Sequence, residues 1–133
     1  MVIDSSALIA LLLSEPETDA FVTAIAGSSI RLISAASYLE TTIVMLSRSG
    51  SEGQRKLDRL LTDLAATVFP FTLDQAVLAA EAYKRYGKGS GHPAGLNFGD
   101  CFTYGLAKLT GEPVLFKGND FSRTDLASAV SQR

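Results

Sequence analysis

Short apolar runs alternate with longer segments of helical periodicity along the chain, and this alternation restricts the fold more than any other feature. The runs cover residues 1–3, 30–33, 68–71 and 113–116, and their lengths are typical of buried strands. Strands that alternate with helices form parallel sheets with crossover helices on both faces. We therefore predict a single α/β domain over residues 1–133, with a central parallel sheet between two layers of helices.

The segments between these runs carry residues that commonly start and stop helices. Ser34 and Asn97 are favourable N-cap residues, and Gly111 suits a helix end. Pro70 indicates that the third run lies at a sheet edge or that Pro70 is the last residue of its strand. The expected helices cover 7–13, 14–27, 35–47, 54–66, 73–86 and 97–111, and a last short strand covers 126–130.

Two acidic residues at the ends of elements are open to two interpretations. Asp4 ends the first apolar run, and Asp100 falls at the third helical position after Asn97. Either carboxylate can act only as a helix cap, where the helix dipole contributes about 0.3–1 kcal/mol. Alternatively, they belong to a functional site, because ligands of α/β sheets bind at the carboxyl ends of strands.

Glu40 lies inside an apolar arc of the helix expected over 35–47. The apolar members of this arc are Ala36, Leu39, Ile43, Val44 and Leu46. A buried carboxylate without a partner is costly, so we expect Glu40 to be paired, protonated or bound to a cation. In the later helices, Val77, Leu78 and Ala80 are expected to face inward, and Phe98, Phe102, Leu106 and Leu109 form an apolar stripe.

The composition excludes several classes of protein. The net charge is −2, whereas proteins that depend on phosphate contacts are normally basic, so any nucleic acid binds locally or through a divalent metal. The single cysteine, Cys101, favours a reducing cytoplasm, and we expect it to be a small buried hydrophobe. No stretch approaches the ~20 apolar residues of a membrane span, and no signal peptide is visible.

The remaining polar residues favour a metal site with oxygen ligands. His92 is the only histidine and lies in a glycine-rich loop, so we expect it at the surface and find zinc or triad chemistry a poor fit. The carboxylates of Asp4, Glu40 and Asp100, with the Asn119–Asp120 pair after the last strong strand, lie on elements that can converge. Convergence of three or four carboxylates predicts a metal site.

Four stretches, in order, resemble the motifs of PIN-domain nucleases. They are Val-Ile-Asp-Ser-Ser-Ala-Leu at 2–8, Ala-Ser-Tyr-Leu-Glu at 36–40, Leu-Asn-Phe-Gly-Asp-Cys at 96–101 and Leu-Phe-Lys-Gly-Asn-Asp-Phe at 115–121. More narrowly, they resemble the VapC toxins of prokaryotic toxin–antitoxin pairs. The resemblance covers essentially the whole chain, in length and in motif order.

This resemblance implies a flavodoxin-like three-layer α/β/α fold and an endoribonuclease that depends on Mg²⁺ or Mn²⁺. The implied partners are an RNA substrate, a VapB-type antitoxin and a second copy of the chain, with DNA reached only through the antitoxin. Asp4, Glu40 and Asp100 match the first three acidic positions of the family. Many relatives have an acid where this chain has Asn119, so either Asn119 or Asp120 is the fourth member.

Each matched residue has an expected role. Asp4 and Asp100 hold the metal, directly or through water, and Glu40 with Asp120 or Asn119 holds water ligands or a second ion. Ser6 matches the hydroxyl position after the first Asp, and Lys117 and Arg123 are candidate phosphate contacts. Without metal, such a cluster predicts a raised pKa for at least one carboxylate.

The sequence also bears on two functional classes other than a nuclease. A haloacid-dehalogenase-like phosphatase needs a second Asp where this chain has Ser6, and a receiver domain needs an Asp after a middle strand, which residues 71–72 do not provide. A noncatalytic interaction module with a vestigial acidic pocket stays open, because the fourth acid is ambiguous.

Overall fold

The computed structural model describes residues 1–130, and its strands and helices alternate as predicted. The strands are β1 (Val2–Ile3), β2 (Leu32–Ser34), β3 (Thr67–Phe69) and β4 (Val114–Leu115). The helices are α1 (Ser5–Leu12), α2 (Thr18–Ala26), α3 (Ala35–Asp63), α4 (Leu73–Tyr86) and α5 (Phe98–Thr110), with a 3₁₀ helix η1 (Phe121–Arg123). All strand pairs are parallel, and their order is β3-β2-β1-β4. The predicted parallel α/β class is therefore confirmed.

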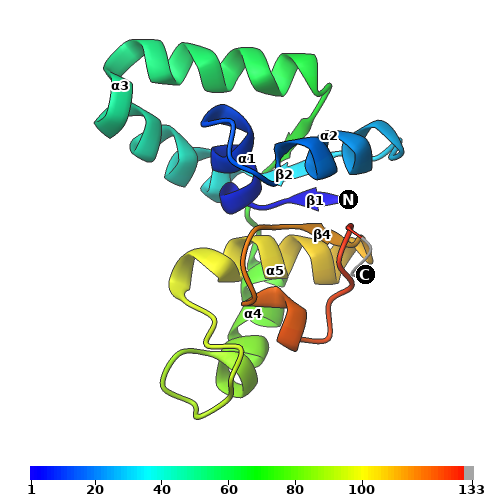
Figure 1. Cartoon of the computed structure of the whole chain (residues 1–133). Helices are drawn as coiled ribbons and strands as arrows, with labels where there is room; N and C mark the ends of the chain where they lie inside the picture. Colours follow the sequence, from blue (N-terminus) through cyan, green and yellow to red (C-terminus); the bar gives the residue numbers. More distant parts are fainter. Residues whose placement is uncertain (131–133) are drawn as a thin grey trace.

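Helices cover both faces of the sheet, with α1, α2 and α3 on one side and α4 and α5 on the other (Figure 1). Alternate strand residues point to opposite faces. Ile3 and Leu115 belong to the core cluster that includes α1 and α2, whereas Val2 and Val114 belong to the cluster that includes α5. β1 and β4 are thus buried on both faces, as parallel strands between helix layers require.

The strand order changes direction at β1. β2 and β3 lie on one side of β1, and β4 lies on the other. Ligands of open α/β sheets bind at such a switch point, outside the carboxyl ends of the strands. Asp4 directly follows β1 and Asp120 lies shortly after β4, so the topology brings the first and last acidic motifs to the same edge.

The helix starts follow the predicted capping residues. Ser34 Oγ accepts a hydrogen bond from the Ala36 N–H at 3.3 Å at the start of α3. Asn97 and Asp100 form a reciprocal capping box at the start of α5, and Gly111 ends that helix in the left-handed conformation with φ of 74°. These three predictions are confirmed.

The helices expected over 35–47 and 54–66 are the two halves of α3. Gly50 interrupts the helical backbone with φ of 58° and ψ of −146°, a conformation that glycine adopts far more readily than other residues. The two halves consequently run in different directions (Figure 1). β3, which ends just before Pro70, is an edge strand as predicted.

Three local predictions are wrong. The second helix begins at Thr18 and not at 14, because Ser14 adopts a positive φ of 52° that helical geometry does not allow. Residues 126–130 form no strand, only an isolated bridge between Ser128 and Val114. Cys101 is half-buried and not fully buried, because it lines an open slot between α4 and α5.

The apolar arc of α3 faces solvent. Leu39 and Ile43 are 58% and 54% exposed, whereas Ser37 and Thr41 on the other side of the helix are buried. Their hydroxyls are satisfied inside the protein, since Thr41 Oγ1 donates to the Ser37 carbonyl at 2.8 Å and Ser37 Oγ lies 3.4 Å from Thr103 Oγ1. Hydroxyl residues with internal partners can therefore form the inner face of this helix.

Two further stripes are also oriented differently from the prediction. Val77 and Ala80 of α4 are exposed, because α4 packs on α5 through the small residues Ala79 and Ala82. Phe98 and Leu109 lie at the exposed ends of the α5 stripe. Among residues 1–130, no helix is both long and apolar enough to cross a membrane.

Candidate active site

An acidic cavity of about 280 Å³ opens at the carboxyl ends of β1 and β4. Four carboxylates line it, and they come from four separate parts of the chain: Asp4, Glu40, Asp100 and Asp120. Asp4 follows β1, Glu40 lies in the first turns of α3, Asp100 lies in the first turn of α5, and Asp120 follows β4. The predicted convergence of the acidic motifs in one cavity is present in the structure.

Asp4 is held at the bottom of this arrangement by two hydrogen bonds. Its carboxylate is only 4% exposed. Thr103 Oγ1 donates to Asp4 Oδ1 at 2.5 Å, and the Ser6 N–H donates to Asp4 Oδ2 at 3.1 Å. The second bond caps α1. Asp4 therefore both caps this helix and lines the acidic cavity.

Asp100 is buried as well, at 9% exposure, and its surroundings disfavour its charge. Its Oδ2 accepts from the Asn97 N–H at 3.0 Å, which favours the ionised form. Burial and the negative charges of Asp4, Asp120 and Glu40 outweigh this bond and raise the pKa of Asp100 to about 7. The cavity therefore holds negative charge that its protein neighbours do not neutralise.

Glu40 is half-buried at the edge of the exposed arc of α3 and does have a partner. Ser5 Oγ donates to Glu40 Oε1 at 2.7 Å. A side chain at position 99 would overlap with the Glu40 carboxylate, so Gly99 provides the space that this carboxylate occupies. The expectation that Glu40 is paired is met by a hydroxyl, not by a cation of the protein.

The two alternatives for the fourth position are placed differently. Asp120 lines the cavity and contributes to the raised pKa of Asp100. Asn119 is exposed and does not line it, and its carbonyl accepts from Ser122 Oγ at 2.7 Å. The geometry thus favours Asp120 over Asn119.

The three residues expected to position substrate occupy different places. Ser6 lines the cavity, and its Oγ accepts from the Lys117 N–H at 3.0 Å. Lys117 also lines it, but its Nζ donates to Glu15 at 2.7 Å and lies 3.4 Å from Glu17. Arg123 is exposed in η1 and does not line the cavity.

His92 lies outside the acidic cavity. Its Nδ1 accepts from the Ala94 N–H at 3.0 Å, and its ring packs edge-on against Tyr86. This histidine therefore organises its own loop.

Sequence reasoning missed three residues that shape the site: Ser5, Gly99 and Thr103. Ser5 and Thr103 donate to Glu40 and Asp4, and Gly99 makes room for Glu40. The position of Thr103 carries a readable signal, because residues i and i+3 of a helix lie on one face and Thr103 is three places after Asp100. Gly99 in the first turn of a helix is a weaker signal of close approach.

The donor set suits a hard divalent cation that keeps part of its water shell. Within residues 1–130, no group of three or more acidic, histidine or cysteine side chains is arranged so that it could hold a metal ion. Mg²⁺ typically uses one or two carboxylates and several waters, and the unneutralised charge around Asp100 is what such an ion would offset. The residues present therefore fit Mg²⁺ or Mn²⁺.

The model of the PIN-domain family matches residues 1–126. This range includes every residue that lines the acidic cavity. The chain belongs to the PIN-domain family.

Proteins with similar sequences show to which subgroup of the PIN-domain family the chain is most similar. Ribonuclease VapC30 of Mycobacterium tuberculosis H37Rv is 52% identical over 130 residues, which are 98% of each chain. Ribonuclease VapC of Mycolicibacterium smegmatis is 51% identical over 96% of this chain and 98% of its own. Ribonuclease VapC28 of M. tuberculosis H37Rv is 47% identical over the full length of both. Within the family, the chain accordingly groups with the VapC-type members.

A solved structure shares the fold. The crystal structure of M. tuberculosis VapC20, described as a toxin that cleaves the sarcin–ricin loop, matches with a TM-score of 0.77 and covers 98% of each chain at 16% identity. The comparison confirms the predicted flavodoxin-like three-layer α/β fold.

Proposed function

We propose that the protein is a metal-dependent endoribonuclease, the toxin of a type II toxin–antitoxin pair, that hydrolyses RNA phosphodiester bonds. The observation that carries this proposal is the meeting of four carboxylates at the switch point of the sheet, with negative charge that no salt bridge within residues 1–130 neutralises. Membership of the PIN-domain family and the ribonuclease names of the relatives support the same activity.

Asp4 and Asp100 would hold a Mg²⁺ or Mn²⁺ ion, directly or through water. When bound, the ion supplies positive charge beside the phosphodiester and lowers the pKa of water. Thr103 and the Ser6 N–H fix the orientation of the Asp4 carboxylate. The Asn97 cap does the same for Asp100.

Glu40 and Asp120 are proposed to orient water molecules in the cavity. Both carboxylates accept hydrogen bonds from water in the cavity and thereby orient it. Ser5 limits the rotation of Glu40, so that one carboxylate face stays directed at the cavity. Asn119 is assigned no such role, because Asp120 lines the cavity and Asn119 does not.

Ser6 and Lys117 are proposed to position the scissile phosphate, with Arg123 as an outer contact. Lys117 Nζ is 36% exposed and paired with Glu15 and Glu17. Exposed ion pairs of this kind are worth about 1 kcal/mol or less, so a phosphate can draw the ammonium group away from them.

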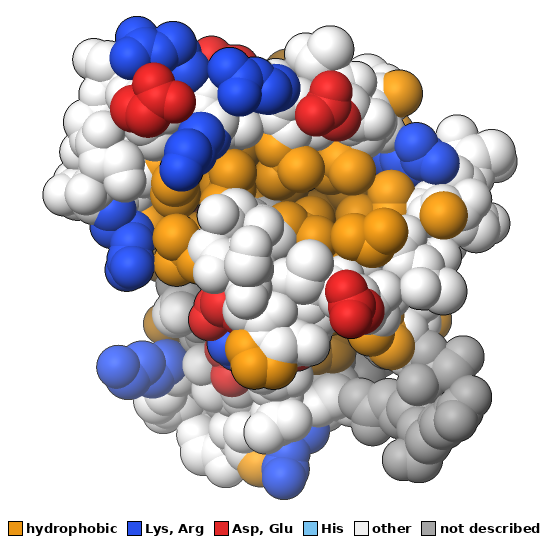
Figure 2. Space-filling model, turned by 45° about the horizontal axis from the view of Figure 1, so that its top comes forward, with side chains coloured by type: hydrophobic (Ala, Val, Ile, Leu, Met, Phe, Trp, Pro, Cys, Tyr) orange, Lys and Arg blue, Asp and Glu red, His pale blue; other side chains and the backbone are white. Residues whose placement is uncertain are grey.

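Apolar surface supports the proposed protein partners, a VapB-type antitoxin and a second copy of the chain. Figure 2 shows apolar side chains gathered in a band with both basic and acidic side chains around it, a surface that suits an amphipathic partner helix. The solvent-facing arc of Leu39, Ile43 and Leu46 on α3 is the proposed homodimer contact. DNA is reached only through the antitoxin, and the compartment is the cytoplasm.

Cleavage of labelled RNA with Mg²⁺ or Mn²⁺, with and without chelator, tests the proposal. We expect metal-dependent cleavage that Asp4→Asn lowers by about 1,000-fold or more, while the exposed Asp74→Asn on α4 serves as a matched control without effect. Asp120→Asn should lower the rate and Asn119→Ala should not. Chelator-resistant cleavage contradicts the metal role, and a folded protein that cleaves no RNA supports a noncatalytic interaction module.

A further inference from the structure

A second polar cluster ties the segment that carries Asp120 to α5. Tyr104 Oη donates to Asp125 Oδ1 at 2.7 Å, and Lys108 Nζ donates to Asp125 Oδ2 at 2.6 Å. Tyr104 and Lys108 lie on α5, whereas Asp125 follows η1 in the C-terminal segment. We call these three residues the carboxylate clamp. None of them lines the acidic cavity.

Both oxygens of the Asp125 carboxylate are occupied, and one of the two donors is buried. Tyr104 is only 4% exposed. Burial and the hydrogen bond to Asp125 raise the pKa of the Tyr104 hydroxyl above its ordinary value, so this group stays protonated and remains a donor. Hydrogen bonds to an ionised carboxylate are stronger than those between neutral groups. The clamp is therefore a firmer link than a single ion pair at the surface.

The position of Asp120 depends on the backbone that carries it. The Asp120 side chain makes no capping hydrogen bond at the start of η1, although it lines the acidic cavity. Three attachments hold the surrounding segment, residues 117–125. The Lys117 N–H donates to Ser6 Oγ at 3.0 Å before Asp120, and Phe121 is buried directly after it. The clamp at Asp125 is the third attachment.

Electrostatic repulsion opposes the position that Asp120 occupies. Its charge is one of those that raise the pKa of Asp100, so the two carboxylates repel each other when no cation is bound. This repulsion favours movement of the Asp120 segment away from α5. The clamp acts in the opposite direction, because Tyr104 and Lys108 follow Asp100 on α5 by about one and two turns.

We propose that Tyr104 and Lys108, acting through Asp125, are positioning residues that keep Asp120 in the acidic cavity. This inference rests on the proposed function, in which Asp120 orients water near the metal. The clamp acts on the backbone of residues 117–125 and not on the reacting atoms. One helix, α5, then both carries Asp100 and anchors the segment that carries Asp120.

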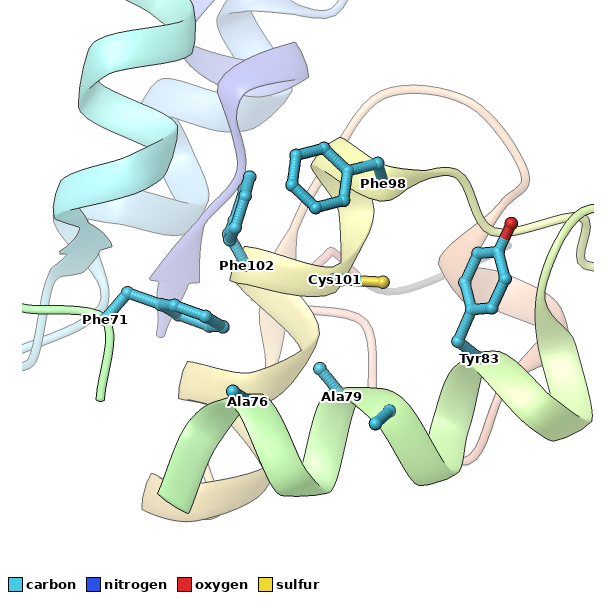
Figure 3. Close-up of a pocket in the computed structure, with 8 residues that line it drawn as sticks. Phe71, Ala76, Ala79, Tyr83, Phe98, Cys101 and Phe102 are labelled. Atoms are coloured by element: carbon cyan, nitrogen blue, oxygen red, sulfur yellow. The ribbon is translucent and has the colours of Figure 1, made fainter. Parts of the chain in front are cut away.

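The clamp is separate from the apolar surface assigned to the second copy of the chain. The apolar pocket between α4 and α5 (Figure 3) includes Phe98 and Phe102, and these rings line one groove with Leu39 and Ile43 of α3. The clamp residues line neither the pocket nor the groove. Changes in the clamp should therefore leave the oligomeric state unaltered, which size-exclusion chromatography checks.

A double-mutant cycle on Mn²⁺ affinity tests the inference without RNA. Asp125→Ala should approach the loss of affinity caused by Asp120→Ala, about 10- to 100-fold. Tyr104→Phe, which keeps the ring and removes one hydrogen bond, should weaken binding by about 2- to 10-fold. In the Asp120→Ala background, either change should have less than about a 2-fold further effect, because the carboxylate that the clamp positions is already absent.

Three lysine variants distinguish the clamp from an ordinary surface ion pair. Lys108→Met removes one donor and should weaken Mn²⁺ binding as Tyr104→Phe does. Lys108→Arg keeps a cation and should bind Mn²⁺ as the unaltered protein does. Lys84→Met is the matched control, because it removes an exposed ion pair with Glu81 at 2.9 Å on α4, and it should have no effect.

Amide hydrogen exchange of residues 118–122 in chelator follows the segment itself. We expect Tyr104→Phe to speed this exchange. Addition of Asp120→Ala should slow it again, because the repulsion that opens the segment is then removed. Exchange that is equally fast in both backgrounds overturns the inference, since the clamp then stabilises the segment without regard to Asp120.

The outcomes separate the clamp from the nuclease. Equal Mn²⁺ affinity of Asp125→Ala and the unaltered protein overturns the inference, even where RNA is cleaved. A loss by the same factor with and without the Asp120 carboxylate overturns it too. Coupled losses in a protein that cleaves no RNA support the clamp and contradict the nuclease. In a protein that binds no Mn²⁺, the amide exchange decides alone.

Discussion

The two sides of the first turn of α5 reverse the usual pattern of burial. On one side, the carboxylate of Asp100 is 9% exposed among other acids, and on the other, the ring of Phe98 is 77% exposed. A fold selected for stability alone would exchange these environments, because buried charge and exposed aromatic surface both cost free energy. Because Asp100 and Phe98 both depart from the usual burial of their side-chain types, this turn is expected to contact ligands or partners.

The largest expected effect lies on the charged side. Asp100→Asn should abolish metal-dependent cleavage and at the same time stabilise the metal-free protein at pH 8 by about 1–3 kcal/mol. The stabilisation follows because the pKa of Asp100, raised to about 7, makes its ionised form unfavourable in the folded state. Urea unfolding in chelator measures the stability, and rate assays measure the activity.

The pH dependence of this effect has a definite sign. Between pH 4 and 7 the folded protein holds a proton on Asp100 that the unfolded chain has released, so stability falls as the pH rises through this window. The advantage of Asp100→Asn should therefore be small near pH 4 and full above pH 7. An advantage that is independent of pH would show that burial of charge at Asp100 is not the cause.

A second, intermediate effect concerns the support of Asp4. Thr103→Val removes the hydroxyl that donates to Asp4 Oδ1 and should lower activity by about 10- to 100-fold. It should also cost about 1–3 kcal/mol of stability, since a buried acceptor loses its partner. Thr103→Ser keeps the hydroxyl and should retain most of the activity. Equal activity of the Val and Ser variants would separate Thr103 from the site.

The smallest expected effect lies on the apolar side. Phe98→Ser should change the free energy of unfolding by less than about 1 kcal/mol, because exposed positions contribute little to stability. Thermal unfolding checks this value. A loss of several kcal/mol would mean that Phe98 is a structural residue, and the contrast between the two sides of the turn would then disappear.

The features that the sequence predicted well depend on local chemistry. Asn97 and Ser34 start helices because their side chains reach N–H groups two or three residues away, and Gly111 adopts a backbone conformation that favours glycine. The convergence of Asp4 with Asp100 was expected because both lie at the ends of elements that can approach one edge of the sheet, and because both match motifs of PIN-domain nucleases. Such features need no knowledge of what packs against them.

The features that were predicted wrongly, or not at all, depend on distant partners. The buried face of α3 includes a hydroxyl contact between Ser37 and Thr103, which lie 66 residues apart in the sequence. The pairing of Lys117 with Glu15 spans 102 residues. An apolar arc such as that of Leu39 and Ile43 has the same periodicity whether it meets a core or a partner protein, so periodicity cannot choose between the two.

The capping box at the start of α5 ties the acidic cavity to the secondary structure itself. Asp100 Oδ2 accepts a hydrogen bond from the Asn97 N–H. The helix start itself therefore fixes the position of the carboxylate, without any bound ion or RNA. Inserting or deleting one residue in this turn would move the carboxylate by about 100° around the helix. A substitution that disrupts this capping box is therefore expected to disturb both the start of α5 and the position of the Asp100 carboxylate in the cavity.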